Sequence, residues 1–168
     1  MIHISYCFDK NYQQHFGASL MSLLLNFEGD VSDLCVHVIT DEMDHVFSEK
    51  LDRLRSIFKA HIEVSLLKPD DLQKLENLPA KMEHMTFMAF ATWYRILIAS
   101  ILPPDVQRVL HLDSDTIVLS DIRDIFNVDM KGAPIAGVAD YSSEYMSAKL
   151  HLNNYINAGV LLMDLQQW

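Results

Sequence analysis

The stretch VLHLDSDTIVL, residues 109–119, places two carboxylates, Asp113 and Asp115, one residue apart in an otherwise apolar run. A sheet core disfavours charge, so a carboxylate there must leave the core, meet a cation or hold a proton. In extended backbone the two side chains point the same way and can reach one hard cation such as Mg²⁺ or Mn²⁺. The pair therefore indicates either a metal site or an Asx turn that exposes both carboxylates to water.

The pattern around this stretch predicts an α/β protein. Strand-like runs cover residues 2–8, 34–40, 61–67, 108–112, 134–139 and 155–163. Helical spacing predicts helices over 12–27 and 48–59, and a very apolar helix over 85–102 that Pro103 and Pro104 stop. Strands that are apolar on both faces and joined by helices favour a mainly parallel sheet covered on both sides. Ligands of such sheets gather outside the carboxyl ends of strands, where the two Asp stand.

Composition narrows the class of protein. The 168 residues are 50% hydrophobic and carry a formal net charge of −10, which fits one globular domain over 1–168 and argues against a nucleic-acid partner. No apolar run is long enough to cross a bilayer, so no transmembrane segment is expected. Cys7 and Cys35 lie in apolar stretches and are interpreted as buried thiols of a cytoplasmic protein. The charged segment 67–82 is interpreted as an excursion within the domain, and Asp164 as a helix N-cap.

Other residues bear on the carboxylate pair. Arg95 lies in a helix so apolar that its guanidinium should meet a carboxylate or phosphate, or else extend to the surface. No glycine-rich phosphate loop follows the first strand, so a bound diphosphate would need a metal ion instead. The eight histidines show no metal-ligand spacing, and His111 alternates within a strand, so all are expected to be structural.

Five stretches in order resemble glycosyltransferase family 8, a group of retaining enzymes with the Rossmann-like GT-A fold that includes lipopolysaccharide galactosyltransferases and glycogenin. They are HISYCFDKNY (3–12), ATWYRILI (91–98), VLHLDSDTIVL (109–119), IAGVADY (135–141) and YINAGVLLMDLQQW (155–168). The resemblance covers essentially the whole chain. It implies a nucleotide-sugar-binding domain with a UDP-sugar donor and a Mn²⁺ or Mg²⁺ cofactor.

The resemblance also implies a nucleotide and metal site. Asp9 and Asn11 would hold the uracil side of the donor, although both are also ordinary turn residues after a strand. Arg95 would contact the donor and brace the acidic site. Asp113 and Asp115 would bind the metal ion.

The remaining implied positions lie near the ribose and the transferred sugar. Ser114, with Asp113, would lie near the ribose. Asp140 and Asn157 would touch the transferred sugar as catalytic positions, and Ala158 with Gly159 would let backbone approach the donor. Plainer interpretations stay open, because Asp140 could cap a turn and Asn157 with Gly159 could form a bulge.

The implied reaction is metal-dependent transfer of a hexose, from UDP-glucose or UDP-galactose, to a glycan or lipopolysaccharide-type acceptor with retention. Family members continue beyond the position of Trp168 and supply a third metal ligand, a His in a His-x-x-Gly-x-x-Lys-Pro-Trp motif. The domain is therefore expected to be truncated, to bind donor and to transfer little or no sugar by itself. An exposed core would favour self-association. A cytoplasmic location is expected, with peripheral contact at the inner membrane through the missing part.

Two other functions compete with this one. LDSDTIV also resembles the Asp-x-Asp-x-Thr signature of haloacid-dehalogenase-type phosphatases, in which Asp113 would be the nucleophile and Asp115 the acid/base. That signature normally follows the first strand of its fold, and here too little chain follows Asp115. The third hypothesis is a nucleotide-sugar-binding module without turnover.

Overall fold

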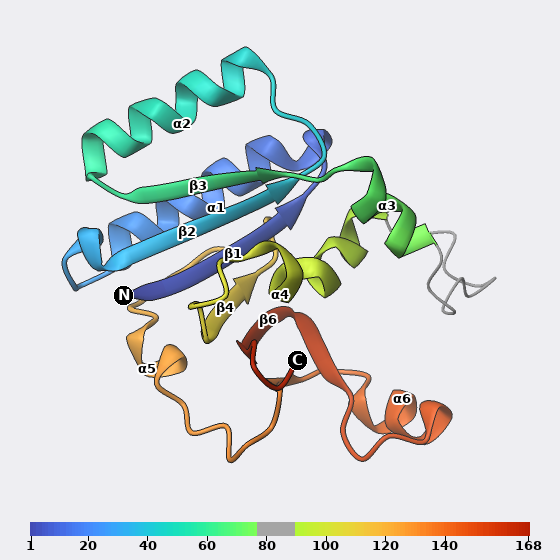
Figure 1. Cartoon of the computed structure of the whole chain (residues 1–168). Coiled ribbons are helices and arrows are strands. Elements are labelled where there is room, and N and C mark those ends of the chain that lie inside the picture. The colour runs from blue at the N-terminus through green and yellow to red at the C-terminus, as the bar shows by residue number, and fades with distance from the viewer. Residues whose placement is uncertain (77–89) are drawn as a thin grey trace.

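The computed structural model describes residues 1–76 and 90–168. Its centre is a six-stranded sheet with the order β3-β2-β1-β4-β6-β5 (Figure 1). The strands are β1 (Ile2–Phe8), β2 (Leu34–Thr40), β3 (His61–Leu66), β4 (Arg108–Leu112), β5 (Ile135–Ala139) and β6 (Ile156–Asp164). Neighbours from β3 to β4 pair in parallel, whereas β6 runs antiparallel to both β4 and β5. The predicted mainly parallel α/β sheet is confirmed, with β6 reversed.

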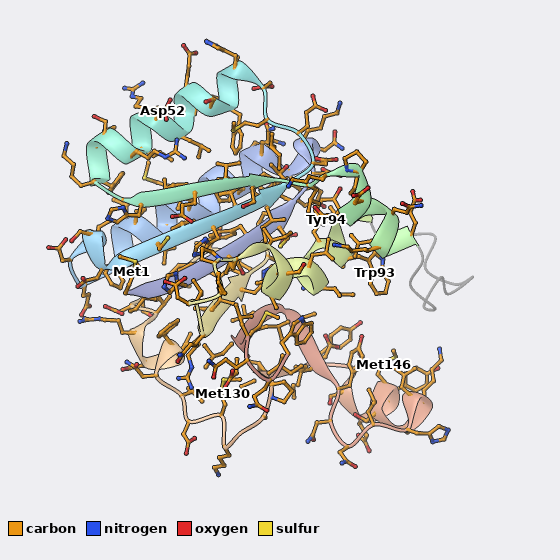
Figure 2. All side chains as sticks on the ribbon, in the orientation of Figure 1. Met1, Asp52, Trp93, Tyr94, Met130 and Met146 are labelled. Atoms are coloured by element: carbon orange, nitrogen blue, oxygen red, sulfur yellow. The ribbon has the colours of Figure 1, made fainter. Side chains whose placement is uncertain are left out.

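Helices cover both faces of this sheet (Figure 1). The longer helices are α1 (Gln13–Asn26) and α2 (His45–Phe58), on one face. The other face is covered by α3 (Pro69–Glu76), the 3₁₀ helix η3 (Phe90–Leu97) and α4 (Ile98–Ile101). The remaining short helices are η1 (Lys10–Tyr12), η2 (Val31–Asp33), α5 (Arg123–Phe126) and α6 (Ser143–Leu150). No residue of α6, which carries Met146, is buried, and this helix stands away from the sheet (Figure 2).

Two apolar cores hold the layers together. Under α1 and α2, β1 contributes Phe8, whose ring stacks on Phe16 with centroids 4.6 Å apart and meets Phe47 edge-on. Under η3 and α4, the opposite side of the sheet packs Val109 and other buried residues against Ile98. Strand β1 therefore feeds alternate side chains into both cores, as a central strand of a covered sheet must.

The apolar segment 85–102 differs from the single helix that was predicted. Residues 85–89 lie outside the described residues, and the rest forms η3 before one turn of α4. Thr92 and its aromatic neighbours Trp93 and Tyr94 are poor α-helix formers, and the Arg95 side chain takes the Thr92 carbonyl oxygen at 2.9 Å. As predicted, the helix ends before Pro103, with Leu102 in extended backbone.

Smaller differences concern the ends of elements. Part of the charged segment 67–82 is helical as α3, and its residues 77–82 lie outside the described residues. Helix α2 begins three residues earlier than predicted because Asp44 caps it, accepting the Phe47 N–H at 2.7 Å. Asp164 does cap one turn, accepting the Gln166 N–H at 3.0 Å.

Both cysteines are free thiols and buried, as predicted. Among the helices of residues 1–76 and 90–168, none combines the length and the apolar character that a membrane span requires.

Candidate functional site

A cavity of about 250 Å³ opens where the carboxyl ends of β1 and β4 meet. It is lined by five of the predicted site residues, namely Asp9, Arg95, Asp113, Ser114 and Asp115. Because β1 and β4 are parallel neighbours, the loops that follow them must lie at one edge of the sheet, and η3 closes the cavity from the side.

Arg95 binds a carboxylate and not solvent. Its Nη2 donates to Asp113 Oδ1 at 2.8 Å, its Nε donates to the Thr92 carbonyl, and its Nη1 donates to the Ala158 carbonyl. The Arg95 side chain is only 12% exposed. One guanidinium therefore joins η3, the end of β4 and the start of β6, and the carboxylate partner predicted from the apolar helix is found.

Asp113 is also close to a buried histidine. His111 Nε2 lies 3.4 Å from Asp113 Oδ1 without hydrogen-bond geometry, and His111 Nδ1 lies 3.3 Å from the Ser5 hydroxyl. Burial raises the pKa of Asp113, but the His111 ring and the Arg95 charge lower it by more, so this pKa lies below its ordinary value. Asp113 is therefore an anion at neutral pH that is fixed before any ligand binds.

The chain turns directly after Asp113. The Thr116 N–H and hydroxyl both donate to the Asp113 carbonyl, at 3.1 and 2.7 Å. The turn buries Ser114 and exposes Asp115. The turn interpretation is thus half right, because backbone does turn here, but only one of the two carboxylates faces water freely. Asp115 is left available to a cation from the cavity.

A chain of hydrogen bonds links this turn to the other predicted positions. The Asp113 N–H donates to the Gly159 carbonyl at 2.7 Å, and the Gly159 N–H donates to Asn157 Oδ1 at 2.8 Å. Asn157 Nδ2 in turn donates to Asp140 Oδ2 at 3.3 Å. Strand β6 thereby brings Asn157, Ala158 and Gly159 beside the carboxylate pair.

Gly159 has a spatial reason to lack a side chain. A Cβ there would lie 3.0 Å from Asp113 Oδ2 and 3.0 Å from Asn157 Oδ1. The β5–β6 pairing is also irregular here, since Gly137 pairs with Leu161 but Ala139 pairs with Ile156. Both interpretations of this region are therefore correct: the strand pairing is irregular, and the Gly159 backbone closely approaches Asp113.

Asp140 and Asp9 also serve as turn residues. Asp140 Oδ1 accepts the Ser142 N–H at 2.8 Å and the Ser142 hydroxyl at 2.6 Å, and these bonds lower the pKa of Asp140. Asp9 accepts the Asn11 N–H at 2.9 Å and begins η1. The interpretations of Asp140 as a turn cap and of Asp9 as a turn residue after a strand are therefore both correct.

Asn11 is separated from the other predicted residues. It lines a neighbouring hollow of about 610 Å³ between α1 and α2, together with Phe47, and not the cavity of the carboxylate pair. The structure thus brings Asp9 and the β4 and β6 residues together and places Asn11 next to them.

Sequence reasoning missed the part that His111 plays in this site. The available signal was its spacing, because residues 111 and 113 lie on one side of an extended strand. The buried imidazole lies beside Asp113 and helps to lower the pKa of this carboxyl group, so His111 is more than a core residue.

The chain matches known proteins over almost its whole length. Residues 3–168 match the family described as "Glycosyl transferase family 8". General stress protein A of Bacillus subtilis is 23% identical over 172 residues, which cover 100% of this chain and 57% of the relative. Lipopolysaccharide 1,3-galactosyltransferase of Salmonella typhimurium is 27% identical over 174 residues, which cover 99% of this chain and 49% of the relative. The chain spans about half the length of these curated relatives.

Solved structures share the fold. An active-site mutant of LgtC superposes with a TM-score of 0.82 at 18% identity, covering 99% of this chain and 59% of LgtC. Mouse xyloside xylosyltransferase 1 superposes with a TM-score of 0.65 at 18% identity, covering 99% of this chain and 67% of that protein. The LgtC match confirms the predicted GT-A fold.

Proposed function

Because the chain belongs to glycosyltransferase family 8, we propose that it carries the donor-binding part of an enzyme that transfers a hexose from a UDP-sugar with retention. Its relatives named as lipopolysaccharide galactosyl- and glucosyltransferases support UDP-galactose or UDP-glucose as donor and a glycan or glycolipid as acceptor. A cytoplasmic location, with peripheral contact at the inner membrane where the acceptor is lipid-linked, belongs to the same proposal.

The observation that carries the proposal is the asymmetric carboxylate pair at the cavity. Asp113 is held as an anion by Arg95, whereas Asp115 is exposed and lines the same cavity. An acidic protein needs a cation to accept an anionic diphosphate, and these two carboxylates are the groups on which it would bind.

The donor set fits a hard divalent cation. Carboxylate oxygens suit Mn²⁺ and Mg²⁺, and Oδ2 of Asp113 is left free of the Arg95 ion pair. In the described part of the chain, three potential ligand groups gather only at His3, Cys35 and His37, so Asp113 and Asp115 are two ligands without a third. We therefore propose weak affinity for the metal ion in the absence of nucleotide.

When bound, the metal ion would supply Lewis-acid stabilisation of the departing diphosphate. The protein residues then have positioning roles. Asp9 would hold the uracil side of the donor, with Asn11 close by, and Ser114 would contact the ribose. Arg95 keeps Asp113 ionised and oriented.

The transferred hexose would lie against Asp140 and Asn157. The Asn157 amide is fixed at both ends, by Asp140 and by the Gly159 N–H, so it can present one orientation to a sugar hydroxyl. Ala158 and Gly159 keep this part of β6 free of bulk. Transfer by this chain alone is proposed to be weak or absent.

The phosphatase alternative is not favoured. The carboxylate pair follows β4, the fourth strand among the described residues, and the family match runs over residues 3–168. A nucleotide-sugar-binding module without turnover remains the competing outcome.

Calorimetric titration of UDP with and without Mn²⁺ tests the proposal. Wild type should bind UDP more tightly with Mn²⁺, and Asp115→Ala should lose that gain. Asp124→Ala removes an exposed carboxylate that does not line the cavity and should behave like wild type. The proposed donor site would be refuted if the affinity for UDP changed neither with Mn²⁺ nor with the Asp115→Ala substitution.

Turnover then separates the remaining functions. Release of UDP from UDP-glucose or UDP-galactose would distinguish an enzyme from a binding module. Hydrolysis of p-nitrophenyl phosphate that Asp113→Asn abolishes would instead support the phosphatase.

A further inference from the structure

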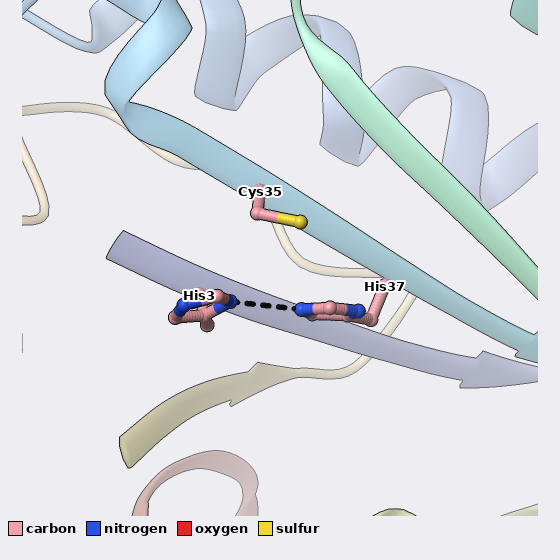
Figure 3. Close-up of side chains that lie close together, drawn as sticks. All are labelled: His3, Cys35 and His37. Atoms are coloured by element: carbon pink, nitrogen blue, oxygen red, sulfur yellow. Dashed lines mark hydrogen bonds between the residues drawn. The ribbon is translucent and has the colours of Figure 1, made fainter. Parts of the chain in front are cut away.

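Three potential metal ligands meet on β1 and β2, and none of them lines the donor cavity. They are His3 of β1 and Cys35 and His37 of β2, whose ligand atoms all lie within 4.8 Å of one another. Figure 3 shows the two imidazoles facing each other nitrogen to nitrogen, with the Cys35 sulfur beside them. Cys35 and His37 are each only 4% exposed, and His3 is half-buried.

Strand register creates this cluster. His3 pairs with Cys35 across the parallel β1–β2 ladder, and His37 lies two residues further along the same strand. Residues at i and i+2 of a strand share a face, so all three side chains project to the same side of the sheet. The cluster is therefore fixed by main-chain hydrogen bonds and not by a loop.

We propose that His3, Cys35 and His37 form a second metal site, which takes a borderline-soft divalent ion, Zn²⁺. Two imidazoles and a thiolate are the ligand types that Zn²⁺ prefers, whereas Mn²⁺ and Mg²⁺ prefer the oxygens of Asp113 and Asp115. The two sites of this chain would thus select different metals by ligand chemistry. The second site goes beyond the proposed transferase function and does not depend on it.

Metal binding requires the two imidazole rings to move. His3 Nδ1 and His37 Nε2 are 3.0 Å apart. A tetrahedral Zn²⁺ with Zn–N bonds of about 2.0–2.1 Å separates two nitrogen ligands by about 3.3 Å, so the rings must part by about 0.3 Å. The ring centroids are 5.2 Å apart and the ring planes are inclined by 19°, so the two nitrogens face each other nearly head to head. Each ring must therefore also rotate for the two lone pairs to meet at a tetrahedral ion.

Glu63 of β3 supplies the orienting partner that such sites use. Its Oε2 lies 3.3 Å from His37 Nδ1. A carboxylate on Nδ1 keeps the proton there and leaves the lone pair on Nε2, which faces His3. Glu63 is paired with His37 in the strand register, and its side chain is 58% exposed. A water molecule would occupy the fourth position.

The metal-free state is a hydrogen-bonded chain. Glu63 accepts from His37, and the His3 Nδ1 proton fills the space between the two rings. On binding, that proton moves to His3 Nε2, the Cys35 thiol loses its proton to solvent, and a sulfur–zinc bond forms. The ion would then link β1 to β2 outside the donor cavity. His3 is the second residue of β1 and Asp9 directly follows this strand, so these two residues are about 20 Å apart.

Cobalt is a spectroscopic probe for this proposal. Metal-stripped full chain titrated with Co²⁺ should develop a thiolate-to-cobalt charge-transfer band that saturates at one equivalent and is removed by Zn²⁺. Zinc should also raise the thermal unfolding midpoint. Cys35→Ser should abolish the band, and Glu63→Gln should weaken Zn²⁺ binding about 10–100-fold.

Two matched controls assign the site. Cys7→Ser removes the other buried thiol, which lies on the same strand as His3, and should keep the band. Asp115→Ala removes the hard-metal site and should keep it too. If Cys35→Ser does not fold by circular dichroism, His3→Gln, at a half-buried position, should lower Co²⁺ affinity more than tenfold.

The proposal is overturned by any of three results. These are no thiolate band with Co²⁺ in wild type, a band that survives Cys35→Ser, or a band that folded Cys7→Ser loses. The first result would leave the cluster as a hydrogen-bond chain alone.

Discussion

Replacing Gly159 by Ala should disturb the carboxylate site without disturbing the fold. The added Cβ would lie 3.0 Å from Asp113 Oδ2 and 3.0 Å from Asn157 Oδ1, whereas ordinary contact begins at 3.4 Å. Each oxygen must therefore retreat by about 0.4 Å. Gly159 does not have a positive φ, so the backbone itself accepts Ala. The strain falls on Asp113, whose other oxygen is held 2.8 Å from Arg95.

The size of the effect follows from this displacement. A misplacement of 1 Å can cost about a hundredfold, so 0.4 Å should weaken Mn²⁺-dependent UDP binding about tenfold, or about 1.4 kcal/mol. Binding without Mn²⁺ should change much less, because Asp113 acts through the metal ion. Calorimetry with and without Mn²⁺ measures both quantities.

Gly17→Ala is the matched control. Gly17 lies within α1, and a Cβ there meets nothing within 4 Å. The control should leave UDP binding unchanged and raise the free energy of unfolding by about 0.5–1 kcal/mol, because Ala favours a helix over Gly. The reasoning about this contact would be refuted if Gly159→Ala bound UDP in the presence of Mn²⁺ as tightly as wild type does. It would also be refuted if both variants lost the same amount of UDP affinity.

Three further predictions concern charge, pH and packing. Arg95→Met removes the cation beside Asp113, so the pKa of Asp113 should rise and Mn²⁺-dependent UDP binding should fail at a higher pH than in wild type; identical pH profiles would contradict this. Burial lowers the pKa of His111, so below about pH 6.5 the unfolded chain takes up a proton that the folded chain does not, and the free energy of unfolding falls as the pH falls. In urea unfolding between pH 5 and 6.5, His111→Gln should reduce this pH dependence by up to about 1.4 kcal/mol per pH unit. An unchanged pH dependence would count against the prediction. Leu110→Ala, at a fully buried position in β4, should cost about 2–5 kcal/mol in urea unfolding, and a loss below 1 kcal/mol would show that the core repacks.

The sequence predicted the positions of the strands well because buried strands of a covered sheet are nearly continuous apolar runs. It did not predict the direction of β6. An apolar run such as the one ending at Met163 has the same pattern whichever way the strand points. A long connection through α5, β5 and α6 separates it from β4, so the antiparallel pairing could not be predicted from its own residues. Nor did periodicity distinguish η3 from an α-helix, because the apolar residues of 90–97 suit both.

The candidate site was predictable where chemistry alone identifies a residue. Arg95 in an apolar helix needed an anion, and Asp113 is that anion. The cluster of His3 with Cys35 and His37 was not found, because His3 lies more than thirty residues before the other two and only the β1–β2 register brings it to them. The histidines were expected to be structural, an expectation that considered spacing along the chain and not across strands.

The unequal exposure of the two carboxylates has a kinetic consequence for the proposed metal site. Asp115 stands in solvent, so its charge should govern how fast the ion arrives, and that rate should fall as salt screens the field. Asp113 is two-thirds covered and held by Arg95, so it should govern how long the ion stays. Removing the outer carboxylate would then slow loading, whereas removing the inner one would shorten the residence time. Asp115 would thus control the association rate of the metal ion, and Asp113 its dissociation rate.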